Sequence, residues 1–357
     1  SIPVCGGFVF GFIRDRWRSA RWGDRQYLLV CGLAGAGVYL WIADSTLDYS
    51  QLLSLVFVAV AVYVMIFAAA QALMTGVAQA HRMTGRLSVV FGFGYITPAV
   101  LSALAGGWLV AHLSVRGTFL IAAAVTLVIA LQAFWRLEAA SDFERRLGQG
   151  ETGFAALRRL FSHRPLWPAA AIYFLWNFGP GWGTPMFYHL TEKVRISSEL
   201  FGTFTALQSA FFLPTTLLYG FLCVRAPLKH LLWWGTIVAI AQGPIMFLAQ
   251  GPASTMAVAV LYGLFGGFAT AAYIDLIMRS CPKGLEGTAM MVSQTSAFAL
   301  AGSSGNLLGS WIYSTGGFAS AVIITTLATA LIVPVLRLVP AELTATRDGE
   351  RIEPGPP

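Results

Sequence analysis

Long uninterrupted apolar runs recur along this sequence and constrain its fold more than any other feature. Full-length runs are predicted at about 27–43, 52–79, 87–113, 118–135, 166–190, 200–224, 231–249, 254–278, 289–313 and 318–336. Each is long enough to cross a hydrocarbon core of about 30 Å as a helix. The runs are continuous, whereas strands of a membrane barrel alternate apolar and polar residues. The sequence therefore predicts an all-α polytopic membrane protein.

Positive charge is distributed as a topology signal rather than as a nucleic-acid-binding patch. The chain carries 23 Lys and Arg and a net charge of +7. If the loop 14–25 is cytoplasmic and the runs alternate, only Arg116, Lys193 and Arg195 fall on the opposite side. Membrane proteins carry this excess of Lys and Arg in their cytoplasmic loops. We therefore predict a multi-pass protein of the bacterial inner (plasma) membrane, with its central linker and C-terminus cytoplasmic and no nucleic-acid partner.

Short matches relate the first half of the chain to the second. The loop around Gly85 resembles the loop around Gly287, about 202 residues later, and Gly11 and Gly220 each end an apolar run before a basic loop. In the second of these loops, Val224 stands where Asp15 would fall. A near-constant offset between matches indicates an internal repeat. Because six runs separate equivalent loops, the two halves are predicted to be parallel.

The repeat predicts two parallel six-helix bundles with the first helix missing, since the chain begins in the middle of a run. The bundles are expected at 1–137 and 166–340, joined by a cytoplasmic linker at 138–165. Within the linker, the pattern of Phe154, Leu157 and Phe161 favours a short amphipathic surface helix over a plain connection. The polar, proline-containing tail 341–357 is predicted to be disordered.

The loop after the first run combines glycine, aspartate and arginine at a membrane boundary. It reads Gly11-x-x-x-Asp15-Arg16, and Arg25 follows after an insertion. Glycine lets helices approach closely, and an aspartate is favoured at a neighbouring helix N-terminus. The string resembles the loop between helices 2 and 3 of major facilitator proteins, which implies a cytoplasmic gate. The alternative is a basic loop that faces anionic lipid.

A second candidate gate lies in the run 166–190. Gly179 and Pro180 follow Trp176 and Asn177, and proline breaks a helix by removing a hydrogen bond and by steric clash. Broken helices build substrate sites and gates in transporters. We therefore predict gating roles for Gly179 and Pro180 and substrate binding by Trp176 and Asn177. The alternative is a purely structural kink.

Polar side chains inside the other runs are few. Gln71, Thr75 and Gln79 lie on one helix face, Gln208 and Gln294 lie in later runs, and these five are predicted to bind substrate. Hydrogen bonds between helices are the alternative for each of them.

Acidic residues within or beside the later runs supply two further candidates. Asp275 is a candidate for coupling because acids within membrane spans are usually functional. Its alternative is an ion pair with Arg279 at i+4. Glu286, in the first turn of a later helix, completes the predicted gate.

Three stretches resemble the folate–biopterin transporter family within the major facilitator superfamily. They are Cys281-Pro282-x-Gly284-x-Glu286-x-Thr288, the segment from Pro180 to Met186-Phe187-Tyr188, and the segment from Leu218 to Lys229. The resemblance implies a transporter with the major facilitator fold. One departure concerns the run 52–79, which corresponds to the family's fourth helix: family members carry acidic residues there and this chain carries Gln71.

Together these features predict a transporter that moves a small organic solute by alternating access. The solute is a folate- or pterin-like molecule or another aromatic metabolite, and a coupling proton or ion is compatible with the pattern. The cysteines and histidines show no metal-ligand spacing, so no metal, cofactor or catalytic residue is predicted. We expect a monomer that is not an enzyme. The alternatives are a transporter-derived sensor or scaffold, or a polytopic membrane enzyme.

Overall fold

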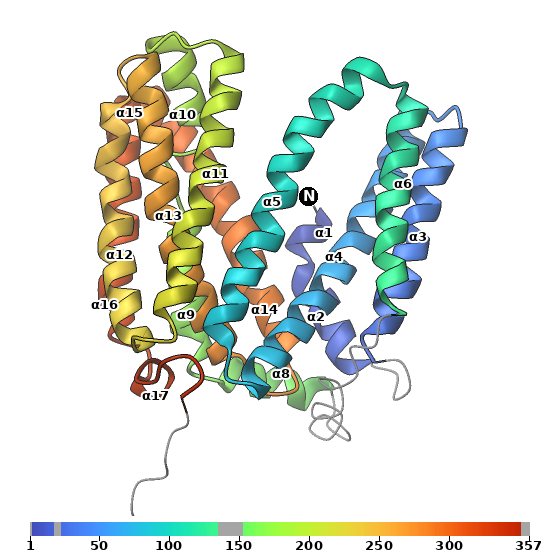
Figure 1. Cartoon of the computed structure of the whole chain (residues 1–357), viewed down its shortest axis with the longest axis horizontal. Helices are drawn as coiled ribbons and strands as arrows, with labels where there is room; N and C mark the ends of the chain where they lie inside the picture. Colours follow the sequence, from blue (N-terminus) through green and yellow to red (C-terminus); the bar gives the residue numbers. More distant parts are fainter. Residues whose placement is uncertain (1, 18–22, 135–152, 351–357) are drawn as a thin grey trace, which may run out of the picture. The chain divides into compact units, whose positions relative to one another are not determined.

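The computed structural model describes residues 2–17, 23–134 and 153–350, and its regular elements over these ranges are helices (Figure 1). Six helical segments of the described chain are long and apolar enough to cross a membrane. They are Arg25–Asp44, Tyr49–Ala80, Val115–Gln132, Leu228–Leu248, Pro252–Ser280 and Glu286–Leu336. The predicted all-α membrane fold is therefore confirmed.

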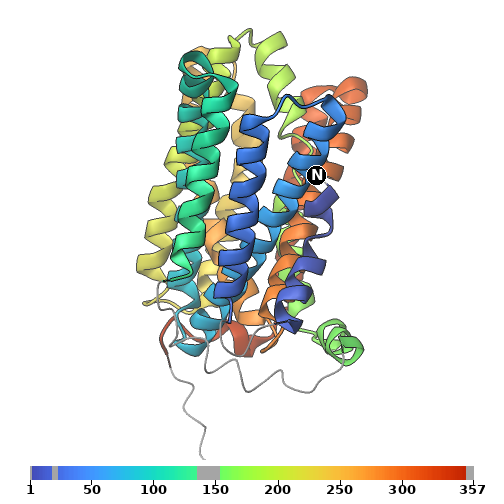
Figure 2. The same ribbon diagram turned by 90° about the vertical axis from the view of Figure 1, so that its right-hand side faces the viewer.

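The first of two compact units contains residues 1–80, 101–163 and 281–295. Its helices are α1 (Ile2–Cys5), α2 (Gly7–Arg16), α3 (Arg25–Asp44), α4 (Tyr49–Ala80), the second part of α5 (Thr84–His112), α6 (Val115–Gln132), α8 (Gly153–Ser162) and α14 (Glu286–Gln294). Figures 1 and 2 show α3 and α6 side by side, where Gly32 meets the backbone of Ala130. The helices α2, α4 and α14 pack on one another around Val64, Ala68 and Met291.

The second unit contains residues 81–100, 164–280 and 296–357. Its helices are the first part of α5, α9 (Leu166–Asn177), α10 (Thr184–Tyr188), η1 (His189–Lys193), α11 (Ser198–Leu222), α12 (Leu228–Ile245), η2 (Met246–Leu248), α13 (Pro252–Ser280), η3 (Thr295–Ala301), α15 (Gly302–Ala330), α16 (Ile332–Leu336) and α17 (Ala341–Thr344). Gly263 and Gly267, one turn apart on α13, bring its backbone against α11. This close contact sets the spacing of the helices that line the cavity described below.

Breaks in two helices occur where the sequence places glycine or proline. The predicted run 166–190 is divided into α9 and α10 by residues 178–183, and Gly183 adopts a φ of 72° that favours glycine. Gly317, with φ 76°, interrupts α15 between the predicted runs 289–313 and 318–336. The break after α9 is held by α15, because Gly181 donates its N–H to Thr325 Oγ1 over 2.6 Å.

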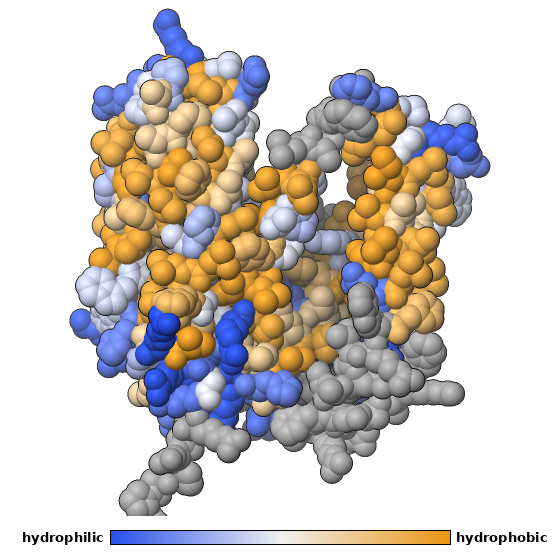
Figure 3. All heavy atoms as spheres, viewed as in Figure 1, coloured by the Kyte–Doolittle hydropathy of each residue, from blue (hydrophilic) through white to orange (hydrophobic). Residues whose placement is uncertain are grey.

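Apolar side chains cover the flanks of the helices. Figure 3 shows hydrophobic residues along the visible flanks and hydrophilic residues gathered mostly at the helix ends. In the second unit Trp234, Trp311 and Leu327 are exposed by 60% or more. Such apolar surfaces are stable in contact with lipid hydrocarbon. A helix can lie there because its backbone polar groups pair with one another inside the helix.

The C-terminal segment differs from its prediction as a disordered tail. Residues 341–344 form α17, and the Asp348 side chain is fully buried against Arg86 and the start of α5. Composition alone misled here because a few polar contacts to charged groups are enough to order a short polar segment. Residues 351–357 of the same predicted tail lie outside the described residues.

The compact units do not follow the predicted halves of the sequence. The segment 281–295 packs in the first unit because α14 lies against α2 and α4, and the first part of α5 packs in the second unit. Each unit therefore contains helices from both halves. In the predicted linker, the described part forms the amphipathic helix α8, with Phe154 and Phe161 exposed. The division into two moving halves stays a prediction.

Candidate functional site

Two charged residues near the end of α2 and one just before α3 form a buried cluster in the first unit. Arg14 is only 1% exposed, and its Nε and Nη2 donate to the two carboxylate oxygens of Asp24 over 2.7 Å each. Its Nη1 donates to Asp15 Oδ1 over 2.8 Å. The bidentate pairing fixes the guanidinium plane and so orients the carboxylate of Asp15.

Asp15 lies at the N-terminus of α14, as the sequence predicted for an aspartate in this loop. Gly287 donates its N–H to Asp15 Oδ1 over 3.2 Å, and Thr288 donates both its N–H and its hydroxyl to Oδ2 over 2.6 Å each. The carboxylate thus meets unpaired N–H groups and the positive end of the helix dipole. We call Arg14, Asp15, Asp24, Gly287 and Thr288 the Asp15 cluster.

Gly11 makes the close approach of α2 and α14 possible. A Cβ atom at Gly11 would lie 2.5 Å from the carbonyl oxygen of Gly287 and 3.0 Å from Thr288 Cα. No side chain fits in that space without moving one of the helices. Gly11 therefore sets the distance over which Asp15 reaches α14.

The other predicted gate residues of the first unit take different places. Arg16 is exposed in the last turn of α2, and Arg25 is the first residue of α3. Glu286 lies in the first turn of α14 as predicted, where its Oε1 accepts the N–H of Gly284 over 2.7 Å. The arginine that holds Asp15 is thus Arg14, which the sequence reasoning did not select. Its position beside Asp15 and near Asp24 was the available signal.

A cavity of about 540 Å³ lies within the second unit. Its lining includes the predicted residues Trp176, Asn177, Gly179 and Gln208. The remaining lining residues are Trp182, Gly183, Thr184, Phe212, Gln242, Tyr262, Gly266, Phe298, Gly302, Ser303 and Asn306. The volume is typical of sites for small organic ligands. Pro180 is buried beside it in the break after α9.

Aromatic rings supply flat walls to this cavity. Trp182 stacks on Tyr262, with ring centroids 4.5 Å apart and an angle of 13° between the planes. Trp176 meets Tyr273 edge to face at 5.6 Å and donates its indole N–H to Thr270 Oγ1 over 2.9 Å. These contacts hold both indoles in place, so a planar ring can stack on them without first ordering them.

Amide and hydroxyl groups supply the polar part of the cavity, and no lining residue is charged. Asn177 and Gln242 donate to the carbonyls of Tyr173 and Tyr262, which leaves their side-chain oxygens as acceptors. The side chains of Gln208 and Ser303 add a further amide and a hydroxyl to the lining. The cavity can therefore offer both donors and acceptors to an uncharged ligand.

The remaining predicted substrate residues lie in the first unit. Gln71 and Thr75 on α4 and Gln294 on α14 are buried, and their side-chain polar atoms have no hydrogen-bond partner among the described residues. An unpaired amide away from water costs about 1–3 kcal/mol, so each is suited to a ligand or water. Gln79 instead donates to the carbonyl of Cys281 over 2.9 Å, a contact that ties α4 to the turn before α14.

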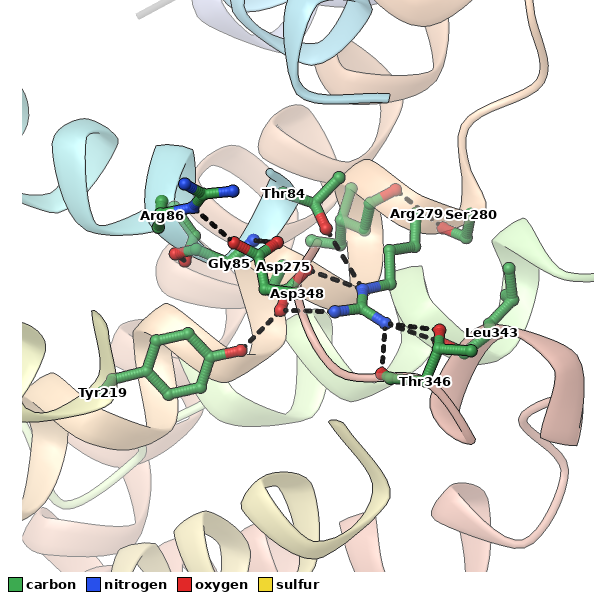
Figure 4. A network of polar contacts seen from close by, with 12 residues as sticks. Thr84, Gly85, Arg86, Tyr219, Asp275, Arg279, Ser280, Leu343, Thr346 and Asp348 are labelled. Carbon is green, nitrogen blue, oxygen red and sulfur yellow. Dashed lines mark hydrogen bonds and ion pairs between the residues drawn. The ribbon is translucent and has the colours of Figure 1, made fainter. Parts of the chain in front are cut away.

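The coupling candidate Asp275 belongs to a paired network in the second unit (Figure 4). Its Oδ1 accepts from Arg279 Nε over 2.9 Å and its Oδ2 accepts from the Tyr219 hydroxyl over 2.6 Å. Arg279 Nε also contacts Thr84 Oγ1 at 3.1 Å. The ion pair at i+4, which the sequence offered as the alternative for Asp275, is thus present.

Comparisons with known proteins agree with this arrangement. The model of the family described as Major Facilitator Superfamily matches residues 1–305. A curated relative, the folate-biopterin transporter of Synechocystis, is 23% identical over 371 residues, which cover 98% of this chain and 74% of the relative.

Solved structures share the fold at low identity. The E. coli fucose:proton symporter FucP aligns with a TM-score of 0.67 and 15% identity over 94% of this chain and 91% of that chain. The proton:xylose symporter XylE aligns with a TM-score of 0.70 and 13% identity over 98% and 86%. The chain therefore belongs to the Major Facilitator Superfamily and is an integral, multi-pass membrane transporter for a small solute.

Proposed function

We propose that this protein transports a planar, uncharged, hydrogen-bonding solute, with a pterin-like ring as the first candidate. The observation that supports this is the cavity of the second unit, where the stacked Trp182 and Tyr262 adjoin amides without any charged lining residue. A bicyclic lactam ring offers two faces for stacking and an edge of donors and acceptors for the amides.

The charge of the ligand separates two candidates suggested by the relative's name. Folate carries a glutamate with two carboxylates, whereas biopterin is neutral. A carboxylate at membrane depth is usually paired with a cation, and the described cavity lining supplies uncharged amides and hydroxyls without a cation. We therefore favour the pterin over the folate.

The transport cycle is proposed to be alternating access, with the Asp15 cluster as a gate. The cluster joins α2, from the first half of the sequence, to α14, from the second half. If these halves move against each other, the cluster must open, so its hydrogen bonds stabilise one end state. Asp275 is already paired with Arg279, so its carboxylate is not proposed as the site of a coupling proton or ion.

Ligand identity is tested by thermal unfolding of the purified protein in detergent. The screen uses biopterin, folate, guanosine and a neutral amino acid, because a ligand that binds the folded state raises the unfolding temperature by mass action. Stabilisation by biopterin but not by folate supports the proposal. Stabilisation by folate alone, or by the amino acid alone, would exclude a neutral planar ligand.

Substitution of the stacking residue tests whether the cavity is the binding site. We expect Trp182→Ala to weaken binding of the stabilising ligand by about tenfold or more, because loss of one stacking partner costs about 1–3 kcal/mol for a base-like ring. The measurement is the ligand concentration needed for half-maximal thermal stabilisation. The control is Trp234→Ala, which removes an exposed indole of α12 in the same unit. Equal weakening by both variants would remove the cavity assignment.

Orientation in the membrane is tested by labelling introduced cysteines. In a background without the four native cysteines, Asp48→Cys and Gly251→Cys should react with a membrane-impermeant maleimide added outside intact cells. Lys229→Cys should react only after the cells are opened. All three native positions are in loops or at a helix start and are not buried. Reaction of Lys229→Cys from outside would reverse the proposed topology.

A further inference from the structure

The C-terminal segment 341–350 places a carboxylate at the start of α5 (Figure 4). Asp348 Oδ1 accepts the N–H of Gly85 over 3.0 Å, and its Oδ2 accepts from Arg86 Nε over 2.8 Å. The Asp348 side chain is fully buried, while that of Arg86 is 48% exposed. A buried aspartate in a polar terminal segment is unusual and needs a physical account.

The same arrangement occurs in the Asp15 cluster, at the repeat-related position. Gly287 follows Gly85 by the repeat offset of 202 residues, and it donates its N–H to Asp15 Oδ1 as Gly85 does to Asp348 Oδ1. The next residue contacts the second oxygen in each case, Thr288 for Asp15 and Arg86 for Asp348. Each helix start is thus capped by one carboxylate in the same way.

The backbone position of Asp348 also corresponds to that of Asp15. Asp15 follows Gly11 by one helical turn, and Gly11 packs on Gly287. In the second unit, Cys223 packs on Gly85, but α11 ends at Leu222, so no helical turn follows.

A carboxylate one turn after Cys223 would belong to residue 227, which is a proline. In a continued helix, residue 227 would donate its N–H to the carbonyl of Cys223, and proline has no N–H. The N–H of Asp348 makes that hydrogen bond instead, over 2.9 Å. Val224, which the repeat in the sequence places where Asp15 would fall, is exposed. The C-terminal segment thus fills the place of the missing helical turn.

We propose that Asp348 is a second gating carboxylate of this transporter, supplied by the C-terminal segment in place of the one that α11 lacks. The inference rests on the proposed gating role of Asp15. It makes the segment a strap between α5, from the first half of the sequence, and the end of α11, from the second half. Release of Asp348 would leave the N–H of Gly85 unpaired and would free α5 to move away from α11.

Polar contacts on both sides of Asp348 attach the strap. Arg279 Nη1 donates to the carbonyl of Thr346 over 2.8 Å, and Gly349 donates its N–H to the carbonyl of Arg82 over 2.7 Å. These bonds lie at the end of the helices, and Arg82 and Gly349 are exposed to water. The strap can therefore detach without the unfolding of any membrane-spanning helix.

Cys223 provides a native reporter of strap release. Its side chain is only 1% exposed and packs on Gly85. A maleimide reagent must reach the sulfur to react with it, so labelling of Cys223 should be slow while the strap is attached.

The test measures the rate of maleimide labelling of Cys223 in the full chain, with Cys5, Cys31 and Cys281 replaced by serine or alanine. We expect Asp348→Asn to raise the rate by about tenfold or more, because hydrogen bonds of a charged group are lost. Arg86→Gln, which keeps the carboxylate, should raise it by a smaller factor. The matched control is Glu350→Gln, which removes the same charge from the same segment. Size-exclusion profiles and the unfolding temperature show that each variant is folded.

The outcomes separate the inference from the proposed transport function. Faster labelling in Asp348→Asn and Arg86→Gln, with Glu350→Gln unchanged, supports the strap even if no transported ligand is found. Equal rates in all variants overturn it, and so does an equal rise in Glu350→Gln. Where a ligand is known, Asp348→Asn should change the uptake rate and leave ligand affinity as in the wild type, since Asp348 does not line the cavity. A change in affinity alone would contradict gating.

Discussion

Replacement of Gly11 by alanine is expected to lower uptake by about tenfold or more. The added Cβ would lie 2.5 Å from the Gly287 carbonyl oxygen, so α2 and α14 must separate. Overpacking of this kind costs about 1–3 kcal/mol. Separation also lengthens the hydrogen bonds from Gly287 and Thr288 to Asp15, which depend on the same close contact. The measurement is the initial uptake rate per folded transporter.

The matched control for this prediction is Gly37→Ala in α3. A Cβ at Gly37 meets nothing within 4 Å. The expected effect of this variant is therefore only the stabilisation of about 0.5–1 kcal/mol that alanine gives over glycine inside a helix. Unchanged or slightly raised stability in Gly37→Ala, with reduced stability and uptake in Gly11→Ala, is the expected pair of results. Uptake in Gly11→Ala equal to that in Gly37→Ala would show that close α2–α14 contact is not needed for transport.

Replacement of Arg14 by methionine is expected to destabilise the first unit by about 3–5 kcal/mol, because it leaves two buried carboxylates without their cation. Asp15 and Asp24 are 1% and 5% exposed at their side chains, so water cannot compensate for the loss. The stability of Arg14→Lys should lie between that of Arg14→Met and that of the wild type, since an ammonium group cannot form the bidentate pair with Asp24. The measurement is the unfolding temperature in detergent.

Two variants show whether the effect comes from the buried pairing. Arg16→Met removes an arginine two residues away that is exposed, and its effect should be within about 1 kcal/mol. The double variant Arg14→Met with Asp24→Leu should recover part of the lost stability, because it removes one of the unpaired charges as well. If Arg14→Met and Arg16→Met are equally stable, the Asp15 cluster contributes nothing to the folded state.

The membrane helices follow from local properties of the sequence. Most of the predicted runs became helices within a few residues of the expected bounds, whereas the runs 166–190 and 289–313 are each divided among several elements and α15 continues past Gly317 into the run 318–336. The reason is that a backbone in hydrocarbon must pair all of its polar groups within the segment itself. The break at 178–183 was equally predictable, since Pro180 and the glycines beside it act on their own helix.

The candidate site was predictable in its residue types and less so in its partners. Trp176, Asn177 and Gln208 line the cavity as expected, whereas Trp182, Gln242 and Tyr262 were not chosen, because nothing local to a sequence tells which aromatic residue faces inward. Gln79, in contrast, was predicted to bind substrate but does not line the cavity. Its amide is bonded to the carbonyl of Cys281, a partner 202 residues away.

The sequence by itself determined that this chain is a membrane-spanning helical transporter. It also determined where glycine and proline break the helices, and that Asp15 suits a helix N-terminus. Those properties depend on the solvent and on neighbours within a turn or two of the chain. Only the tertiary structure decided that Asp15 meets the N–H groups of Gly287 and Thr288 at the start of α14, and that Asp348 occupies the place left empty beyond α11. Such contacts depend on segments more than 250 residues apart, whose meeting is set by helix packing and not by any local pattern.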